Sequence, residues 1–72
     1  MDYRKNFSAR LSTLRKESGL SQKALGEILG VSDAAITFLE KAKRSPSFEI
    51  LCALADYFDV SLDYLVGKSD TK

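Results

Sequence analysis

A chain of 72 residues, 44% hydrophobic and 29% charged, is expected to form one small soluble domain, near the lower length at which a chain can fold alone. Its longest apolar run, Ile50 to Ala55, is far below the roughly 20 residues that span a membrane, and its charged start lacks a signal-peptide core, so no membrane contact is predicted. Histidine is absent, Cys52 has no partner at metal-ligand spacing, and the four glycines are scattered, which argues against an enzyme, a metal site or a cofactor.

The charge is unevenly distributed, although the net charge is only +1. Residues 1–20 hold five basic and two acidic residues, and residues 21–46 hold four basic and three acidic residues. In residues 47–72 the balance is reversed, with two basic and five acidic residues. One end of the molecule could therefore face nucleic-acid phosphates, while the other could not. Scattered lysines on any soluble helix would give a similar count, so charge alone does not decide the function.

The first half of the chain predicts two helices joined by a short turn. The first helix carries one apolar stripe with spacings of four, four and three, formed by Tyr3, Phe7, Leu11 and Leu14. It is expected to end at Gly19, a good C-terminal capping residue. Ser21 is a good N-cap for a second helix that ends at Gly30. Its inward face consists of Leu25, Gly26 and Leu29.

The second half predicts three more helices, which begin at the N-caps Ser32, Ser47 and Ser61. In the third helix Ile36 and Leu39 point inward. The fourth carries Leu51, Leu54, Ala55 and Phe58, and the fifth carries Leu62 and Leu65 and ends at Gly67. The prediction is an all-α domain of five helices over residues 1–66, followed by a short flexible tail over residues 67–72.

Two short helices joined by a glycine-containing turn are typical of a helix-turn-helix. The stretch LSQKALGEILGVSDAAITFLEKAKRSPSFEILCALADYFDVSLDYLVGKSD resembles the phage-repressor and Cro-type helix-turn-helix domain of the XRE family, over about residues 7–69. The resemblance implies a compact five-helix bundle of the lambda-repressor-like type, with helices two and three forming the helix-turn-helix. It also implies binding to operator DNA, often as a dimer. Small members of the family are often lytic-switch regulators of temperate phages.

The resemblance implies roles for particular residues. Four of them would contact the DNA backbone: Ser21 and Gln22 at the start of helix two, and Lys43 and Arg44 after helix three. Arg15 and Glu40 would form a partly buried ion pair that ties helix one to helix three.

The outer face of helix three differs from that of a typical DNA reader. The base-reading positions implied by the family are Asp33, Ala34, Thr37, Phe38 and Lys41. None is Arg, Asn or Gln, whose bidentate base contacts are each worth about 1–3 kcal/mol, whereas specific sites need roughly 4–10 kcal/mol over non-specific ones. Weak sequence reading is therefore predicted.

Phe38 has three interpretations: it packs on the edge of the core, contacts thymine methyl groups, or anchors a protein partner. Ala42 also departs from the family, whose members usually have glycine there. Either Ala42 adopts a strained left-handed conformation, or helix three continues further and holds Lys43 differently.

Three functions remain open. The first is a transcription regulator of a phage-like lysis–lysogeny switch that acts largely through a partner repressor, as an antirepressor or modulator, with weak or cooperative DNA binding. The second is an autonomous Cro-like operator-binding repressor, and the third is a structural interaction domain. A homodimer is possible, with Tyr64 and Leu65 as candidate contacts or as core residues. The lone cysteine in an apolar run fits a small buried hydrophobe and a cytoplasmic location.

Overall fold

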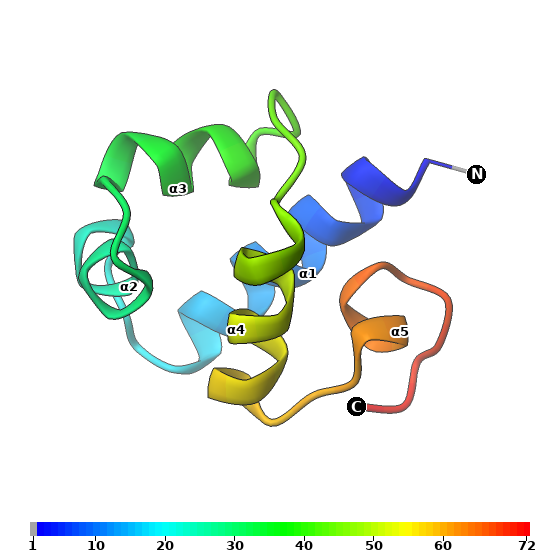
Figure 1. Ribbon diagram of the computed structural model, residues 1–72. Coiled ribbons are helices and arrows are strands. Elements are labelled where there is room, and N and C mark those ends of the chain that lie inside the picture. The colour runs from blue at the N-terminus through cyan, green and yellow to red at the C-terminus, as the bar shows by residue number, and fades with distance from the viewer. Residues whose placement is uncertain (1) are drawn as a thin grey trace.

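The computed structural model describes residues 2–72 and confirms an all-helical fold, with no strand in that part of the chain (Figure 1). The helices are α1 (Tyr3–Glu17), α2 (Gln22–Leu29), α3 (Asp33–Glu40), α4 (Phe48–Phe58) and α5 (Leu62–Leu65). The connections are short, but the packing does not follow chain order: α3 packs on α2 and α1, α5 packs on α1 and α4, and α4 also contacts α2. None of these five helices is long and apolar enough to cross a bilayer.

Every helix has a polar N-cap residue. Ser21, Ser32, Ser47 and Ser61 each accept a hydrogen bond from the backbone N–H three residues later, and Asp2 does the same for α1. The four serine caps are therefore where the sequence predicts them. Each cap satisfies one N–H that would otherwise lack an intrahelical partner and contributes about 1 kcal/mol.

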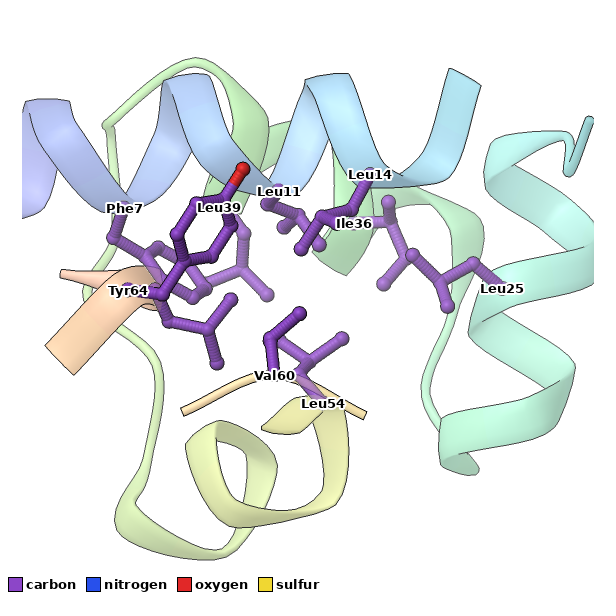
Figure 2. Close-up of a cluster of buried hydrophobic side chains, with 10 residues drawn as sticks. Phe7, Leu11, Leu14, Leu25, Ile36, Leu39, Leu54, Val60 and Tyr64 are labelled. Atoms are coloured by element: carbon purple, nitrogen blue, oxygen red, sulfur yellow. The ribbon is translucent and has the colours of Figure 1, made fainter. Parts of the chain in front are cut away.

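One core joins all five helices (Figure 2). Its buried members are Phe7, Leu11, Leu14, Leu25, Ile36, Leu39, Leu54, Val60, Tyr64 and Leu65. The predicted stripes of α1 and α3 supply half of them. Burying an aliphatic or aromatic side chain of this kind is worth roughly 1.5–3 kcal/mol, so this cluster holds the helices together.

The structure corrects the predicted core at the two ends of the domain. Tyr3 and Leu62 were expected inside, but they are 45% and 40% exposed. Each stands in the first turn of its helix, outside the layer where the helices meet. Tyr64 and Leu65 are buried instead and belong to the core rather than to an outer surface. Cys52 is half-buried.

Gly26 sets the approach of α2 to the turn before α3. A Cβ atom at this position would lie 2.7 Å from the carbonyl oxygen of Val31 and 3.2 Å from backbone atoms of Ser32. Any side chain here would push the turn away from α2, so only glycine permits this packing.

Ala42 adopts the left-handed conformation, with φ of +60°, and α3 ends at Glu40. The N–H of Ala42 donates to the carbonyl of Leu39 (3.3 Å), and the N–H of Lys43 donates to the carbonyl of Phe38 (3.0 Å). This is a Schellman motif with alanine at the position that glycine usually occupies. Of the two sequence alternatives, the strained turn is therefore the one observed, at a cost of about 1–2 kcal/mol.

Residues 67–72, for which the sequence predicts a flexible tail, lie against the domain. The carbonyl of Lys72 accepts a hydrogen bond from the N–H of Ser61 at 2.7 Å. Arg10 forms an ion pair with Asp70 at 2.8 Å, and its guanidinium carbon lies 4.0 Å from the centre of the Tyr64 ring. These contacts join the segment to α1 and α5.

Candidate nucleic-acid interface

Helices α2 and α3 and the turn between them form a helix-turn-helix at one edge of the molecule (Figure 1). Gly30 ends α2 with a left-handed φ of +74°, and the N–H of Val31 donates to the carbonyl of Gly26. The chain then enters α3 at the Ser32 cap. The inner side of α3 buries Ile36 and Leu39, which leaves its other side free to face a ligand.

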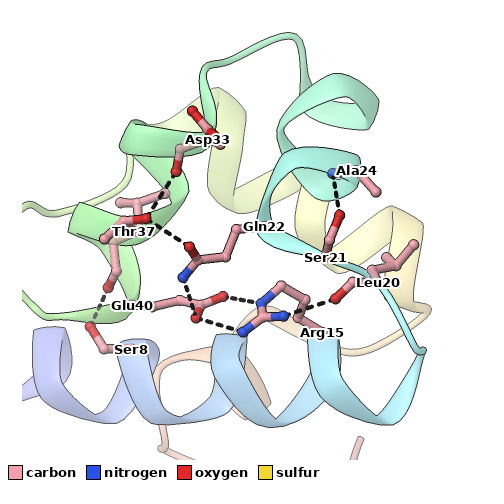
Figure 3. Close-up of polar contacts among 10 residues, drawn as sticks. Ser8, Arg15, Leu20, Ser21, Gln22, Ala24, Asp33, Thr37 and Glu40 are labelled. Atoms are coloured by element: carbon pink, nitrogen blue, oxygen red, sulfur yellow. Dashed lines mark hydrogen bonds and ion pairs between the residues drawn. The ribbon is translucent and has the colours of Figure 1, made fainter.

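The ion pair implied by the resemblance is present between α1 and the end of α3 (Figure 3). Arg15 Nε donates to Glu40 Oε2 at 2.5 Å, and Arg15 Nη2 donates to Glu40 Oε1 at 3.1 Å. Arg15 Nη1 also donates to the carbonyl of Leu20 at 2.8 Å. The two side chains are only 13% and 8% exposed. The hydrogen bond to Glu40 raises the pKa of Arg15 above its usual value, so the arginine stays charged.

Gln22 extends this pair into a network that reaches the outer side of α3 (Figure 3). Its Nε2 donates to Glu40 Oε1 at 3.2 Å, and its Oε1 accepts a hydrogen bond from Thr37 Oγ1 at 2.8 Å. Thr37 Oγ1 also lies 3.1 Å from the carbonyl oxygen of Asp33. A hydroxyl has one proton, so Thr37 donates within the protein, and Gln22 keeps one amide N–H for another partner.

The other residues predicted to contact the DNA backbone differ in whether their side chains are already engaged within the protein. Ser21 Oγ already accepts the N–H of Ala24 as the cap of α2. Lys43 and Arg44 are both exposed. The guanidinium carbon of Arg44 lies 5.1 Å from the centre of the Phe38 ring, which is a cation–π distance. Only Lys43 is therefore exposed and without a described side-chain contact.

The predicted outer face of α3 is present as one surface. Asp33, Ala34, Phe38 and Lys41 are exposed, and Thr37 is half-buried. Phe38 is 39% exposed and is not a member of the core, which removes the core-edge interpretation of this residue. The face combines the apolar Ala34 and Phe38 with the charged Asp33 and Lys41, and Arg44 lies over its aromatic ring.

A hollow beside α3 was not predicted from the sequence. It encloses about 130 Å³ and lies between α3, the loop before α4 and α4 itself. Its lining residues are Val31, Ala35, Leu39, Arg44, Ser45, Pro46, Ser47 and Ile50. Their apolar members are spread over 20 positions of the chain, and no local periodicity links them.

Comparisons with known proteins agree with this geometry. The helix-turn-helix family model HTH_3 matches residues 11–65. The chain is 37% identical over 67 residues to the uncharacterized HTH-type transcriptional regulator YqaE of Bacillus subtilis. This match covers 92% of this chain but 58% of YqaE. It is 39% identical over 57 residues to the repressor protein C2 of Salmonella phage P22, covering 79% of this chain and 26% of the repressor.

Solved structures of transcription regulators also resemble this fold. The P22 c2 repressor in complex with a synthetic operator superposes with a TM-score of 0.77 at 37% identity, covering 82% of this chain and 89% of that one. A transcriptional regulator from Listeria innocua has a TM-score of 0.82 at 38% identity, covering 85% of this chain and 57% of that one. The chain spans little more than half of YqaE and of this Listeria protein. The protein belongs to the HTH_3 helix-turn-helix family, also called the XRE family.

Proposed function

We propose that this protein is a transcription regulator of a phage-like genetic switch and acts largely through a partner repressor. In this role α3 contacts the partner, and DNA binding is weak or cooperative. The observation that carries the proposal is the exposed Phe38 with Arg44 over its ring, on a helix face without any free Arg, Asn or Gln.

An aromatic anchor between small neighbours favours a protein contact. Phe38 is flanked on the outer face by Ala34 and Thr37, and the apolar hollow opens beside the same helix. A ring of this kind can enter a pocket of a partner, where aromatic and arginine side chains carry much of the binding energy. Arg44 would follow the ring and reach a carboxylate or carbonyl at the rim of that pocket.

The geometry supports only a modest contact with the DNA backbone. Gln22 has one amide N–H left after its bonds to Glu40 and Thr37, and Arg44 must leave Phe38 to reach a phosphate. Lys43 and the N-terminus of α2 complete the set. Because this set supplies few phosphate contacts, and such contacts carry no sequence information, it predicts weak, non-specific and salt-sensitive binding.

The test compares Phe38→Ala with Phe48→Ala in calorimetric titrations against the partner repressor that this proposal requires. Phe48 is a matched control because it is 72% exposed and lies on another helix, α4. Phe38→Ala is expected to weaken the complex by about 30-fold or more, which corresponds to the ~2 kcal/mol of a typical anchor. Phe48→Ala should bind as the unchanged protein does. Equal affinity of the two variants would refute the proposed contact.

An autonomous Cro-like repressor is the alternative, favoured by the similarity to the P22 c2 repressor solved with a synthetic operator. It predicts that one duplex selected from a random pool binds far more tightly than the rest. Replacing thymine by uracil in that duplex should weaken binding, because Ala34, Thr37 and Phe38 offer methyl and ring contacts. Replacing Lys43 and Arg44 by glutamine should reduce the salt slope by about 1.8, at roughly 0.9 for each phosphate contact.

A further inference from the structure

We propose that a second copy of this chain docks head to tail on the hollow beside α3. Its acidic corner, residues 56–63, would lie against the basic loop of the first copy, residues 41–47. The inference goes beyond the proposed function, because it uses the acidic end of the molecule, which that function leaves without a role.

The hollow favours an apolar occupant. Val31, Ala35, Leu39, Pro46 and Ile50 supply most of its lining, and it is open to solvent. The hollow has a volume of about 130 Å³. That space accepts one branched aliphatic side chain, and filling it removes exposed apolar surface from water.

The surroundings of the hollow favour an acidic occupant. The basic loop carries Lys41, Lys43 and Arg44, with no acidic residue among residues 41–47. All three cations are exposed, and the ion pairs of residues 2–72 include none of them. A complementary segment therefore needs one or more apolar side chains beside several carboxylates.

The acidic corner of the same chain has both features. Asp56, Asp59 and Asp63 are exposed, and residues 56–63 contain no basic residue. Within the described part of the chain these three carboxylates form no ion pair. Between them lie two large side chains that are also exposed, Tyr57 at 48% and Leu62. Leu62 has a size suited to the hollow.

The position of the carboxylates gives a second reason to expect an external cation. Asp56 lies in the last turn of α4 and Asp59 is its C-terminal cap, and no basic residue occupies that turn. The C-terminus of a helix carries negative partial charge, so carboxylates there are unfavourable within one molecule. Cations supplied by a second copy would relieve this repulsion.

The two surfaces cannot meet within one molecule. Figure 1 shows the loop before α4 and the turn after α4 at opposite ends of that helix. A contact between different surfaces of identical chains is heterologous, and it continues into an open chain unless its rotation closes a ring. Both surfaces are small, so we expect a weak contact that is stronger at low salt and high protein concentration.

Sedimentation equilibrium tests this inference on the intact chain. At about 50 mM salt the average mass should rise with concentration from the 8.0 kDa monomer to beyond the dimer, and at about 500 mM salt it should return to the monomer. A monomer at every concentration up to about 1 mM in low salt would overturn the proposal, as would a dimer that ignores salt, because screened charges must weaken this contact.

Charge-reversal variants identify the two surfaces. Asp56→Lys and Lys43→Glu should each remain monomeric alone, whereas an equimolar mixture of the two should associate again because their charges are complementary. Glu27→Lys is the matched control: it makes the same charge change as Asp56→Lys on an exposed site of α2, and it should associate like the unchanged chain. Association of either single variant, or no association of the mixture, would overturn the proposal.

Failure here is distinguishable from failure of the proposed function. Asp56 lies on α4, away from the outer face of α3, so Asp56→Lys should keep its Phe38-dependent affinity for the repressor whether or not the chain self-associates. A melting temperature equal to or above that of the unchanged chain will show that this variant is folded, since a lysine suits the C-terminus of α4.

Discussion

The alanine at position 42 makes a direct test of backbone strain possible. Ala42 holds a φ of +60° at the end of α3, and its N–H and that of Lys43 cap the helix. Ala42→Gly keeps every one of these hydrogen bonds and removes only the clash of the Cβ atom with the backbone. We expect this substitution to stabilise the protein.

The size of the effect follows from two opposing terms. Relief of the left-handed conformation gains about 1–2 kcal/mol, whereas glycine adds unfolded-state freedom that costs about 0.4–1 kcal/mol. The midpoints of these ranges leave a net gain of about 0.8 kcal/mol, which for a domain of this length raises the melting temperature by about 3–6 °C.

Circular dichroism during heating and during urea titration measures this change. Gly19→Ala and Gly30→Ala are the matched controls, because both glycines have positive φ and a Cβ atom would meet nothing within 4 Å. They should destabilise the protein by a similar amount, since each adds the strain that Ala42→Gly removes. A melting temperature of Ala42→Gly that is unchanged or lower would refute the reasoning.

Two further predictions concern contacts between helices. Arg15→Met should cost about 3–5 kcal/mol in urea unfolding, because it leaves the carboxylate of Glu40 buried without its cation, whereas adding Glu40→Met should recover most of that loss. If the double variant is no more stable than Arg15→Met, the pair is not coupled as the structure indicates. Gly26→Ala should cost about 1–3 kcal/mol, because its Cβ would lie 2.7 Å from a backbone oxygen that cannot rotate away. A melting curve identical to that of the unchanged chain would contradict this packing.

The helices could be predicted because their signals are local. Serine caps at positions 21, 32, 47 and 61 mark four helix starts, and the stripe of Phe7, Leu11 and Leu14 marks the buried side of α1. The same periodicity fails at helix ends. There a residue can continue a stripe without reaching the core, as Tyr3 does. In a helix as short as α5, periodicity gives too few positions to tell Leu62 from Tyr64.

The outer surfaces were harder to predict because they depend on residues far apart in the chain. The hollow beside α3 combines Val31 and Ala35 with Pro46 and Ile50, which only the fold brings together. The stacking of Arg44 on Phe38 depends on the left-handed turn at Ala42, and the sequence left that turn as one of two alternatives.

Hydrogen bonds within the protein determine which polar groups the outer face of α3 can offer to a ligand. The Arg15–Glu40 pair binds the amide nitrogen of Gln22, which turns the amide oxygen toward Thr37. Thr37 then donates its only hydroxyl proton inward, either to Gln22 or to the carbonyl of Asp33, and its methyl group remains for outside contacts. Glu40 of the partly buried ion pair thus holds Gln22, and Gln22 in turn accepts the hydrogen bond from Thr37. The face that results suits thymine methyl groups or an apolar pocket of a partner, and the affinity of Phe38→Ala for the repressor distinguishes these two ligands.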